Sequence, residues 1–183
     1  GTNDFNIDNN RLWNLNMGIH TYNTSGRFAN VESNDIYISY LTTQSTSFGI
    51  KDENNSFPFF HQNKVSSTGF SLAQQPFIGL YSSLSNKPEW FCNRVKNTGS
   101  SMYIKGFTPA HISGNVFNNA YDAFTMGSNA VIGPQGNSGN ASDNKWIGNF
   151  NHSKTFTINT GCNGHSSFFM RTGNLYFPQA STN

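Results

Sequence analysis

The chain has 183 residues, enough for one ordinary domain or for one part of a larger protein. Only 11% of the residues are charged, whereas 15% are aromatic, and 28 residues are Asn. Disordered chains are highly charged and poor in aromatic residues, and helical bundles are rich in Ala, Leu, Glu and Lys, so this composition excludes both classes. Abundant Asn, Gly, Ser and Thr beside aromatic residues are typical of an all-β protein with many tight turns.

The charge pattern excludes further classes. The net charge is +2 and the pI is about 8.6, with basic residues scattered along the chain. We therefore expect no nucleic-acid partner. No apolar stretch approaches the length of a membrane span, so no membrane insertion is expected. The N-terminus lacks a signal peptide and already resembles the rest of the chain, which indicates a mature or excised segment of a larger protein.

In chain order, a short pattern recurs from residues 7–12 (IDNNRL) to residues 141–146 (ASDNKW). It consists of an apolar or large residue, two further residues, Asn, one residue and another apolar residue. The Asn residues of the copies are separated by 24, 29, 30, 22 and 29 positions. They are Asn10, Asn34, Asn63, Asn93, Asn115 and Asn144.

A second signal accompanies the first. Eight residues after the Asn, three copies carry a small residue followed by an apolar residue: Gly18-Ile19, Ser101-Met102 and Ala123-Phe124. The copies of Asn34 and Asn63 carry the same pair later, as Gly49-Ile50 and Gly79-Leu80. Their longer spacing indicates insertions of roughly seven or eight residues at one corner, which loops tolerate well.

These signals predict a right-handed parallel β-helix solenoid of about six to seven coils. Each coil would contain about three short strands, each paired with the same strand of the next coil. An inward Asn at one bend would bond to the Asn above and below it, forming a ladder that satisfies buried polar groups. The alternative is a β-sandwich with Asn in its turns, which would not require the fixed inward offset. We assign the coils to residues 1–150, and residues 151–183 to irregular terminal coils or a partial cap.

The Asn-punctuated repeats resemble right-handed β-helix proteins of the pectate-lyase-like superfamily. Residues 128–146 more specifically resemble large secreted surface proteins of Bacteroidota that leave the cell by type IX secretion. The resemblance implies a secreted or cell-surface bacterial location and flanking domains in the parent protein.

Candidate catalytic and metal-binding groups are dispersed. Among the acidic residues only Asp52 and Glu53 are adjacent, and neighbours on a strand point to opposite faces. The five His residues lack the spacing of a metal site. We therefore predict no catalytic residue, no metal site and no cofactor. The alternative is a part of a polysaccharide lyase or glycoside hydrolase whose catalytic residues lie partly outside this segment.

One arrangement suggests a ligand site. Aligning the coils on the small–apolar pair places two rows of outward residues on one sheet. The rows are His20, Lys51, Tyr81, Tyr103 and Thr125, and Tyr22, Glu53, Ser83, Lys105 and Gly127.

Flat rings beside hydrogen-bonding groups suit a carbohydrate chain, so a polysaccharide or surface glycan is the expected partner. The candidate ligand-binding residues are Tyr81, Tyr103, Lys51, His20, Lys105 and Tyr22. The function predicted is that of a non-catalytic segment of a secreted or cell-surface protein, a rigid spacer with a carbohydrate-binding, adhesive face. An ordinary solvated face on a purely structural repeat remains the alternative.

The two cysteines are predicted not to be joined. Cys92 and Cys162 would be separated by roughly 10–15 Å along the stack, since strands lie about 4.8 Å apart. A disulfide requires Cα atoms within about 7 Å. We expect Cys92 to pack within a strand as a small apolar group.

Overall fold

The computed structural model describes residues 4–13, 15–24, 28–39, 46–68, 76–153 and 157–158. In this part of the chain the protein is all-β, and none of it forms a helix long and apolar enough to cross a membrane. The first sheet, which we call the first face, contains five short strands. They are β1 (Phe5–Asp8), β4 (Ala29–Glu32), β7 (Phe59–His61), β10 (Glu89–Phe91) and β12 (His111–Ser113).

A second, larger sheet bends into two further faces. The second face contains β2 (Arg11–Trp13), β5 (Asp35–Ile38) and β8 (Lys64–Ser67), and the third face contains β3 (Met17–Tyr22), β6 (Ser47–Glu53) and β9 (Phe77–Ser83). Long strands then cover both faces in succession. They are β11 (Arg94–Lys105) and β13 (Val116–Met126), followed by β14 (Lys145–Ser153) and β15 (Thr157–Ile158).

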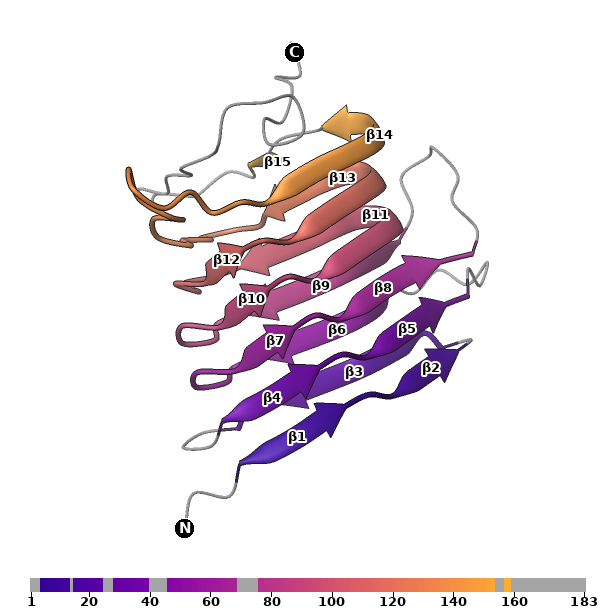
Figure 1. The fold of residues 1–183 in the computed structure, drawn as a ribbon, viewed down its shortest axis with the longest axis horizontal. Helices are drawn as coiled ribbons and strands as arrows, with labels where there is room; N and C mark the ends of the chain where they lie inside the picture. The colour runs from indigo at the N-terminus through magenta and orange to yellow at the C-terminus, as the bar shows by residue number, and fades with distance from the viewer. Residues whose placement is uncertain are drawn as a thin grey trace.

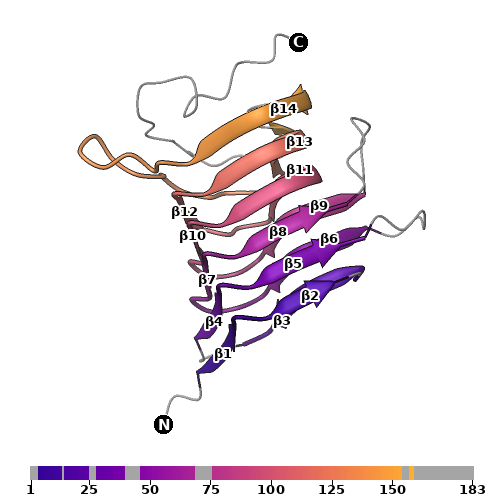
Figure 2. The ribbon, with the colours of Figure 1, turned by 45° about the vertical axis from the view of Figure 1, so that its right-hand side comes forward.

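Every described strand pairing is parallel and joins equivalent strands of successive repeats, a repeat being the stretch from one Asn copy to the next. β11 shows this clearly, because its first part pairs with β8 and its second part with β9. The chain therefore climbs from β1 to β14 in sequence order (Figure 1). Figure 2 shows the first face meeting the second face at a bend that recurs at each level.

The core lies between the three faces. Each face contributes an inward row of apolar side chains, so that Phe60 pairs with Val31 and Trp90 on the first face. The rings of Phe60 and Trp90 stack with centroids 3.9 Å apart. The second face contributes Ile36, Val65, Val95 and Phe117, all fully buried or nearly so. Burial of these rows is the main stabilising contribution expected for such a fold.

The small–apolar pairs lie in one register, as the sequence predicts. Ile19 pairs with Ile50, and the row continues through Leu80, Met102 and Phe124. The small residue is needed because a Cβ atom on Gly49 would lie 2.2 Å from Val65 Cγ1 and 2.5 Å from the Gly79 carbonyl oxygen. The predicted insertions fall between β5 and β6 and between β8 and β9. Residues 40–45 and 69–75 of these connections lie outside the described part.

At two of the bends the chain turns through a residue in the left-handed conformation. At the first bend, between the first and second faces, this residue directly precedes the repeat Asn and has φ from 54° to 67°. The six are Asn9, Ser33, Gln62, Cys92, Gly114 and Asp143. The third bend, which leads back to the first face, uses Asn23, Asn54, Leu84 and Gly106 in the same way. One backbone device thus serves two corners of the molecule.

The position of Cys92 corrects one expectation. Cys92 is an exposed, free thiol, whereas Cys162, the other residue of the prediction that the two are not joined, lies outside the described residues. The expectation that Cys92 packs as an apolar group inside a strand is wrong. Its backbone occupies the left-handed position of the first bend, which turns the side chain away from the core.

The segment after residue 127 departs from the regular pattern. No strand of the described residues continues the first face beyond β12; instead, the Gln135 side chain lies beside this strand. Its Oε1 accepts from the Ile112 N–H at 2.6 Å, and its Nε2 donates to the Ala110 carbonyl at 2.7 Å. Farther on, β14 and β15 both pair with β13. Most of residues 151–183, predicted as terminal coils or a cap, lies outside the described part.

Candidate functional site

The structure brings the six predicted Asn residues into one column along the first bend. Each Asn donates from Nδ2 to Oδ1 of the next, and all five of these distances are 3.0 Å. The column therefore runs without interruption from Asn10 to Asn144.

The side-chain amide of each inner Asn makes two further hydrogen bonds. Asn93 Oδ1 also accepts from the Asn63 backbone N–H at 3.0 Å, and Asn93 Nδ2 also donates to the Phe60 carbonyl at 2.7 Å. The same bonds recur at the other inner members of the column. A buried amide with both its donors and its acceptor occupied avoids the cost of unsatisfied polar groups.

Burial of the column has one exception. From Asn34 to Asn144 the five members are at most 1% exposed, but Asn10 is exposed. The expectation that Asn10 is buried is wrong because β1 and β2, which flank it, have a pairing partner on one side only in the described part.

The predicted outward residues also share one face. Lys51 pairs with His20 on β3 and with Tyr81 on β9, and Tyr103 on β11 follows Tyr81. In the second row, Tyr22, Glu53, Ser83 and Lys105 are consecutive partners. His20, Tyr22 and Lys105 are exposed, whereas Lys51, Tyr81 and Tyr103 are half-buried.

A charged cluster occupies one end of this face. Glu53 Oε2 accepts from Lys51 Nζ at 2.7 Å and from His20 Nε2 at 2.9 Å. The Lys51 ammonium also lies 5.1 Å from the centroid of the Phe48 ring and 5.7 Å from that of Tyr81, which adds cation–π attraction. Sequence reasoning missed Phe48. On β6, Phe48 lies between the buried residues Ser47 and Gly49, so its side chain faces outward.

The tyrosines stack along the molecule. The Tyr81 and Tyr103 rings have centroids 5.7 Å apart and planes inclined by 17°, and the Phe48 and Tyr81 rings meet edge to face with centroids 5.3 Å apart. A Cβ atom on Gly127 would lie 2.5 Å from the Tyr103 hydroxyl oxygen, so this ring lies directly over the glycine. With neighbours against the rings, a ligand would meet ring edges and hydroxyl groups more readily than open ring faces.

The hydroxyl of Tyr81 is held in its protonated form. Burial raises its pKa above the ordinary value. A hydrogen bond with Ser83 opposes this shift, and the smaller effects of the Glu53 carboxylate, which raises the pKa, and of Lys51, which lowers it, follow. At neutral pH the group can therefore donate a hydrogen bond to a ligand.

The adjacent carboxylates point to opposite sides of β6. Glu53 faces outward, whereas Asp52 is fully buried and accepts from Ser82 Oγ at 2.6 Å and from Asn55 Nδ2. Burial raises the pKa of Asp52 to about 6, although hydrogen bonds from Ser82, Asn55, Ser85 and Thr21 act in the opposite direction. These two carboxylates cannot act on one substrate. Within the described ranges, no three His, Cys, Asp or Glu side chains are grouped so as to hold a metal ion.

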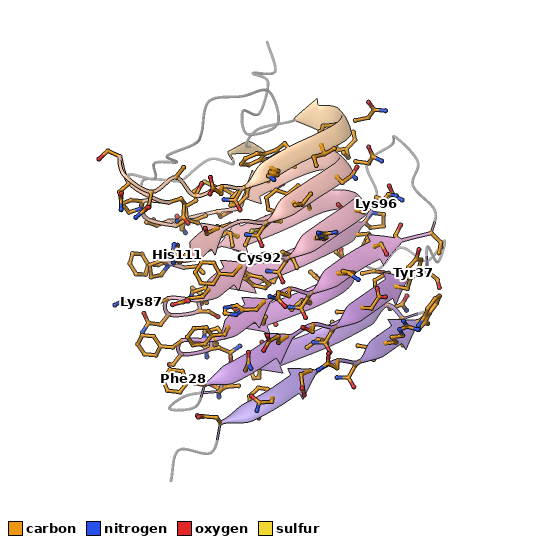
Figure 3. The ribbon with its side chains drawn as sticks, in the orientation of Figure 1. Phe28, Tyr37, Lys87, Cys92, Lys96 and His111 are labelled. Carbon is orange, nitrogen blue, oxygen red and sulfur yellow. The ribbon has the colours of Figure 1, made fainter. Side chains whose placement is uncertain are left out.

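Sequence reasoning missed a groove along the outside of the first bend. It encloses about 540 Å³ and is lined by bend residues Ser33, Gln62 and Cys92 and by second-face residues Asp35, Lys64 and Arg94. Figure 3 shows Cys92 in the middle of this side of the molecule, with His111 and Lys96 on either side. Asp35, Lys64 and Arg94 each directly follow the Asn of their repeat, but this position was not considered as a row of outward side chains.

A row of rings on the first face was also missed. Consecutive members meet at centroid distances of 6.2, 5.6, 5.2 and 4.8 Å, mostly edge to face. The row comprises Phe28, Phe59, His61, Phe91 and His111. These side chains lie outside the core and cover the outer surface of the short strands.

Comparison with known proteins adds no family to this picture. No protein-family model, no curated protein and no solved structure matches the chain. The interpretation of the site therefore depends on its own geometry.

Proposed function

We propose that the chain is a segment of a right-handed parallel β-helix solenoid of the pectate-lyase-like kind. Two observations support this proposal: parallel strand pairing advances by one repeat on every face, and a hydrogen-bonded Asn column follows the first bend. We also propose that the protein is secreted by the type IX system and lies on the surface of a bacterial cell or in the surrounding medium. The repeat pattern of the sequence supports this location.

In this proposal the segment is a non-catalytic rigid spacer that binds carbohydrate on its third face. The observation that carries it is the alignment of Lys51, Tyr81 and Tyr103 on three adjacent strands. Hydrogen-bonding groups repeated at one strand spacing, about 4.8 Å, can meet successive hydroxyls of a polysaccharide or surface glycan. Exposed His20, Tyr22 and Lys105 extend the same surface.

One observation favours the second candidate, a purely structural repeat. Glu53 already pairs with Lys51 and His20, and Tyr81 already stacks on Tyr103, so these groups satisfy one another. The enzyme alternative has no such support among the described residues, because Asp52 and Glu53 face opposite sides.

A glycan array tests the proposal. The double variant Tyr81→Phe/Tyr103→Phe keeps both rings and removes only their hydroxyls. Because a lost hydrogen bond costs about 1 kcal/mol, two should weaken binding at least tenfold. Loss of the hydrogen bond between Tyr81 and Ser83 should lower the free energy of unfolding by no more than about 1 kcal/mol, so the variant stays folded. The matched control is Tyr37→Phe on the second face, where Tyr37 stacks on Trp13 with centroids 4.9 Å apart. Equal binding by all three proteins removes the site, and no binding by the wild type favours the structural repeat.

A further inference from the structure

The groove along the first bend has no part in the proposed carbohydrate site, which lies on the third face. Three successive repeats line it, and each contributes one bend residue and one second-face residue. The second-face residues directly follow the Asn column, so the floor of the groove is anchored to the most regular hydrogen bonding in the molecule. A hollow on such a base keeps its shape without needing a ligand to order it.

The groove contains two positive charges that the fold does not compensate. Lys64 on β8 and Arg94 on β11 are direct partners in register, about 4.8 Å apart at the backbone. Like charges at such positions destabilise a sheet. Within the described part of the chain, neither Lys64 nor Arg94 has an acidic partner within ion-pair distance, in contrast to Lys51, which pairs with Glu53.

The neighbouring residues concentrate this charge at one end. Val116 follows Arg94 in the row, and Asp35, on the other side of Lys64, makes no ion pair with it. Exposed Lys96 lies two residues beyond Arg94 on the same strand (Figure 3). The positive end of the groove is therefore lined by Lys64 and Arg94, with Lys96 nearby on the strand of Arg94, and Asp35 lines the opposite end.

Side chains must supply the recognition, because the bend backbone is already engaged. The N–H of Gln62 donates to the Phe91 carbonyl and that of Cys92 to the Ser113 carbonyl. An arginine presents planar paired donors that match two oxygens of an oxyanion, a lysine adds a mobile positive charge, and the Gln62 amide can donate as well.

We propose that this groove binds an oxyanion group, sulfate, phosphate or carboxylate, between Lys64 and Arg94. The group could be a free inorganic ion or a substituent on a larger chain, since either presents the same oxygens. The site is independent of the third face, so the two proposals can fail separately.

Cys92 provides the test, because its exposed thiol lines the same groove. The measurement is the rate of alkylation of Cys92 by anionic iodoacetate and by neutral iodoacetamide, followed by peptide mass spectrometry so that Cys162 is not counted. A positive groove concentrates the anionic reagent, and any change in thiol ionisation cancels in the ratio of the two rates. At low salt, Arg94→Gln and Lys64→Gln should each lower the ratio about threefold, the effect of one unit charge a few ångströms away in water. Lys105→Gln on the third face should leave it unchanged.

Binding itself is measured in a second arm. Millimolar sodium sulfate or phosphate should slow the reaction of Cys92 with iodoacetamide in the wild type but not in Arg94→Gln, at matched ionic strength with chloride. A sulfated oligosaccharide and its unsulfated counterpart then distinguish a free ion from a substituent: protection by the sulfated form at lower concentration than sulfate assigns the larger chain.

Equal rate ratios in wild type and variants, or equal protection by sulfate, phosphate and chloride, would overturn the proposal. Both charge variants are exposed and relieve the repulsion between Lys64 and Arg94, so neither should lower the unfolding midpoint, which excludes misfolding as the cause of a change. The Tyr81→Phe/Tyr103→Phe protein should behave as the wild type in both arms.

Discussion

The first and third bends use the same backbone device with different side chains. At each, a left-handed residue is followed by a residue that faces the core, as in Cys92 and Asn93 at the first bend and Leu84 and Ser85 at the third. At both bends the backbone N–H of one inward residue donates to the side-chain oxygen of the inward residue in the next repeat. The Asn63 N–H donates to Asn93 Oδ1 at 3.0 Å, and the Asn55 N–H donates to Ser85 Oγ at 3.1 Å.

The two bends differ in how the column continues. At the first bend the next residue is always Asn, so each amide donates to another amide. At the third bend Asn55 has Ser85 as its neighbour, and its Nδ2 instead donates to Thr21 and Asp52. Identical amides satisfy one another, whereas a mixed column brings a carboxylate into the dry interior. Burial of that carboxylate disfavours its charged form, which is why the pKa of Asp52 rises.

The largest expected change in the free energy of unfolding comes from a substitution at the first bend. Replacing Asn93 by Leu removes the buried acceptor of the Asn63 N–H, one of the two acceptors of Asn63 Nδ2 and the amide donor to the Phe60 carbonyl. Since each unsatisfied group costs about 1–3 kcal/mol, the free energy of unfolding should fall by about 4 kcal/mol. Urea denaturation measures this loss. Asn10→Leu, at the exposed end of the same column, is the matched control and should cost less than about 1 kcal/mol. Similar losses in both variants would show that the column does not stabilise the bend.

At the third bend, removing the charge of Asp52 is expected to change the free energy of unfolding by less and in the opposite direction. The pKa of Asp52 is about 6 in the folded protein, above the value of an unfolded chain, so the folded state holds the proton more tightly. Its contribution to stability is fully present below pH 4 and is lost as the pH rises through about 6, a decrease of at most about 3 kcal/mol. Asp52→Asn should remove this pH dependence and stabilise the protein by about 2 kcal/mol at pH 7.

Urea denaturation between pH 4 and 7 measures this difference, with Glu53→Gln as the outward-facing control. Parallel stability curves for the wild type and Asp52→Asn would contradict a buried carboxylate at the third bend.

The contrast also explains what could be predicted from the sequence. The Asn column was visible because one residue type satisfies the same role at every level, leaving the same letter at 22- to 30-residue intervals. The third bend was not, because Thr21, Asp52 and Ser82 occupy equivalent inward positions with different chemistry. Its left-handed positions hold residues as different as Asn54 and Leu84, since the constraint there is on the backbone.

Prediction of the candidate sites depended on the chosen alignment. Aligning on the small–apolar pair correctly placed Lys51, Tyr81 and Tyr103 on one face. It could not reveal that the tyrosine rings stack on each other, because rotamers do not follow from register. The groove was missed for another reason: a row such as Asp35, Lys64 and Arg94 has no shared residue type, and residue order alone does not show that a hollow forms beside it.

The smallest expected effects concern the backbone that the two bends share. A β-branched side chain is strained in the left-handed conformation, whereas Asn tolerates it, and Asn9 and Asn54 already occupy such positions. Cys92→Val should therefore lower the free energy of unfolding by about 1 kcal/mol, although the side chain is exposed. Cys92→Asn and Leu84→Asn should each raise it by about 0.5 kcal/mol, equally at both bends. Midpoints of urea denaturation resolve these shifts.

If Val were tolerated as well as Asn at Cys92, the left-handed turn would not be a constraint there, and the inward side chains alone would determine the shape of the bends. If only one bend responded to Asn, the two corners would differ in backbone as well as in chemistry.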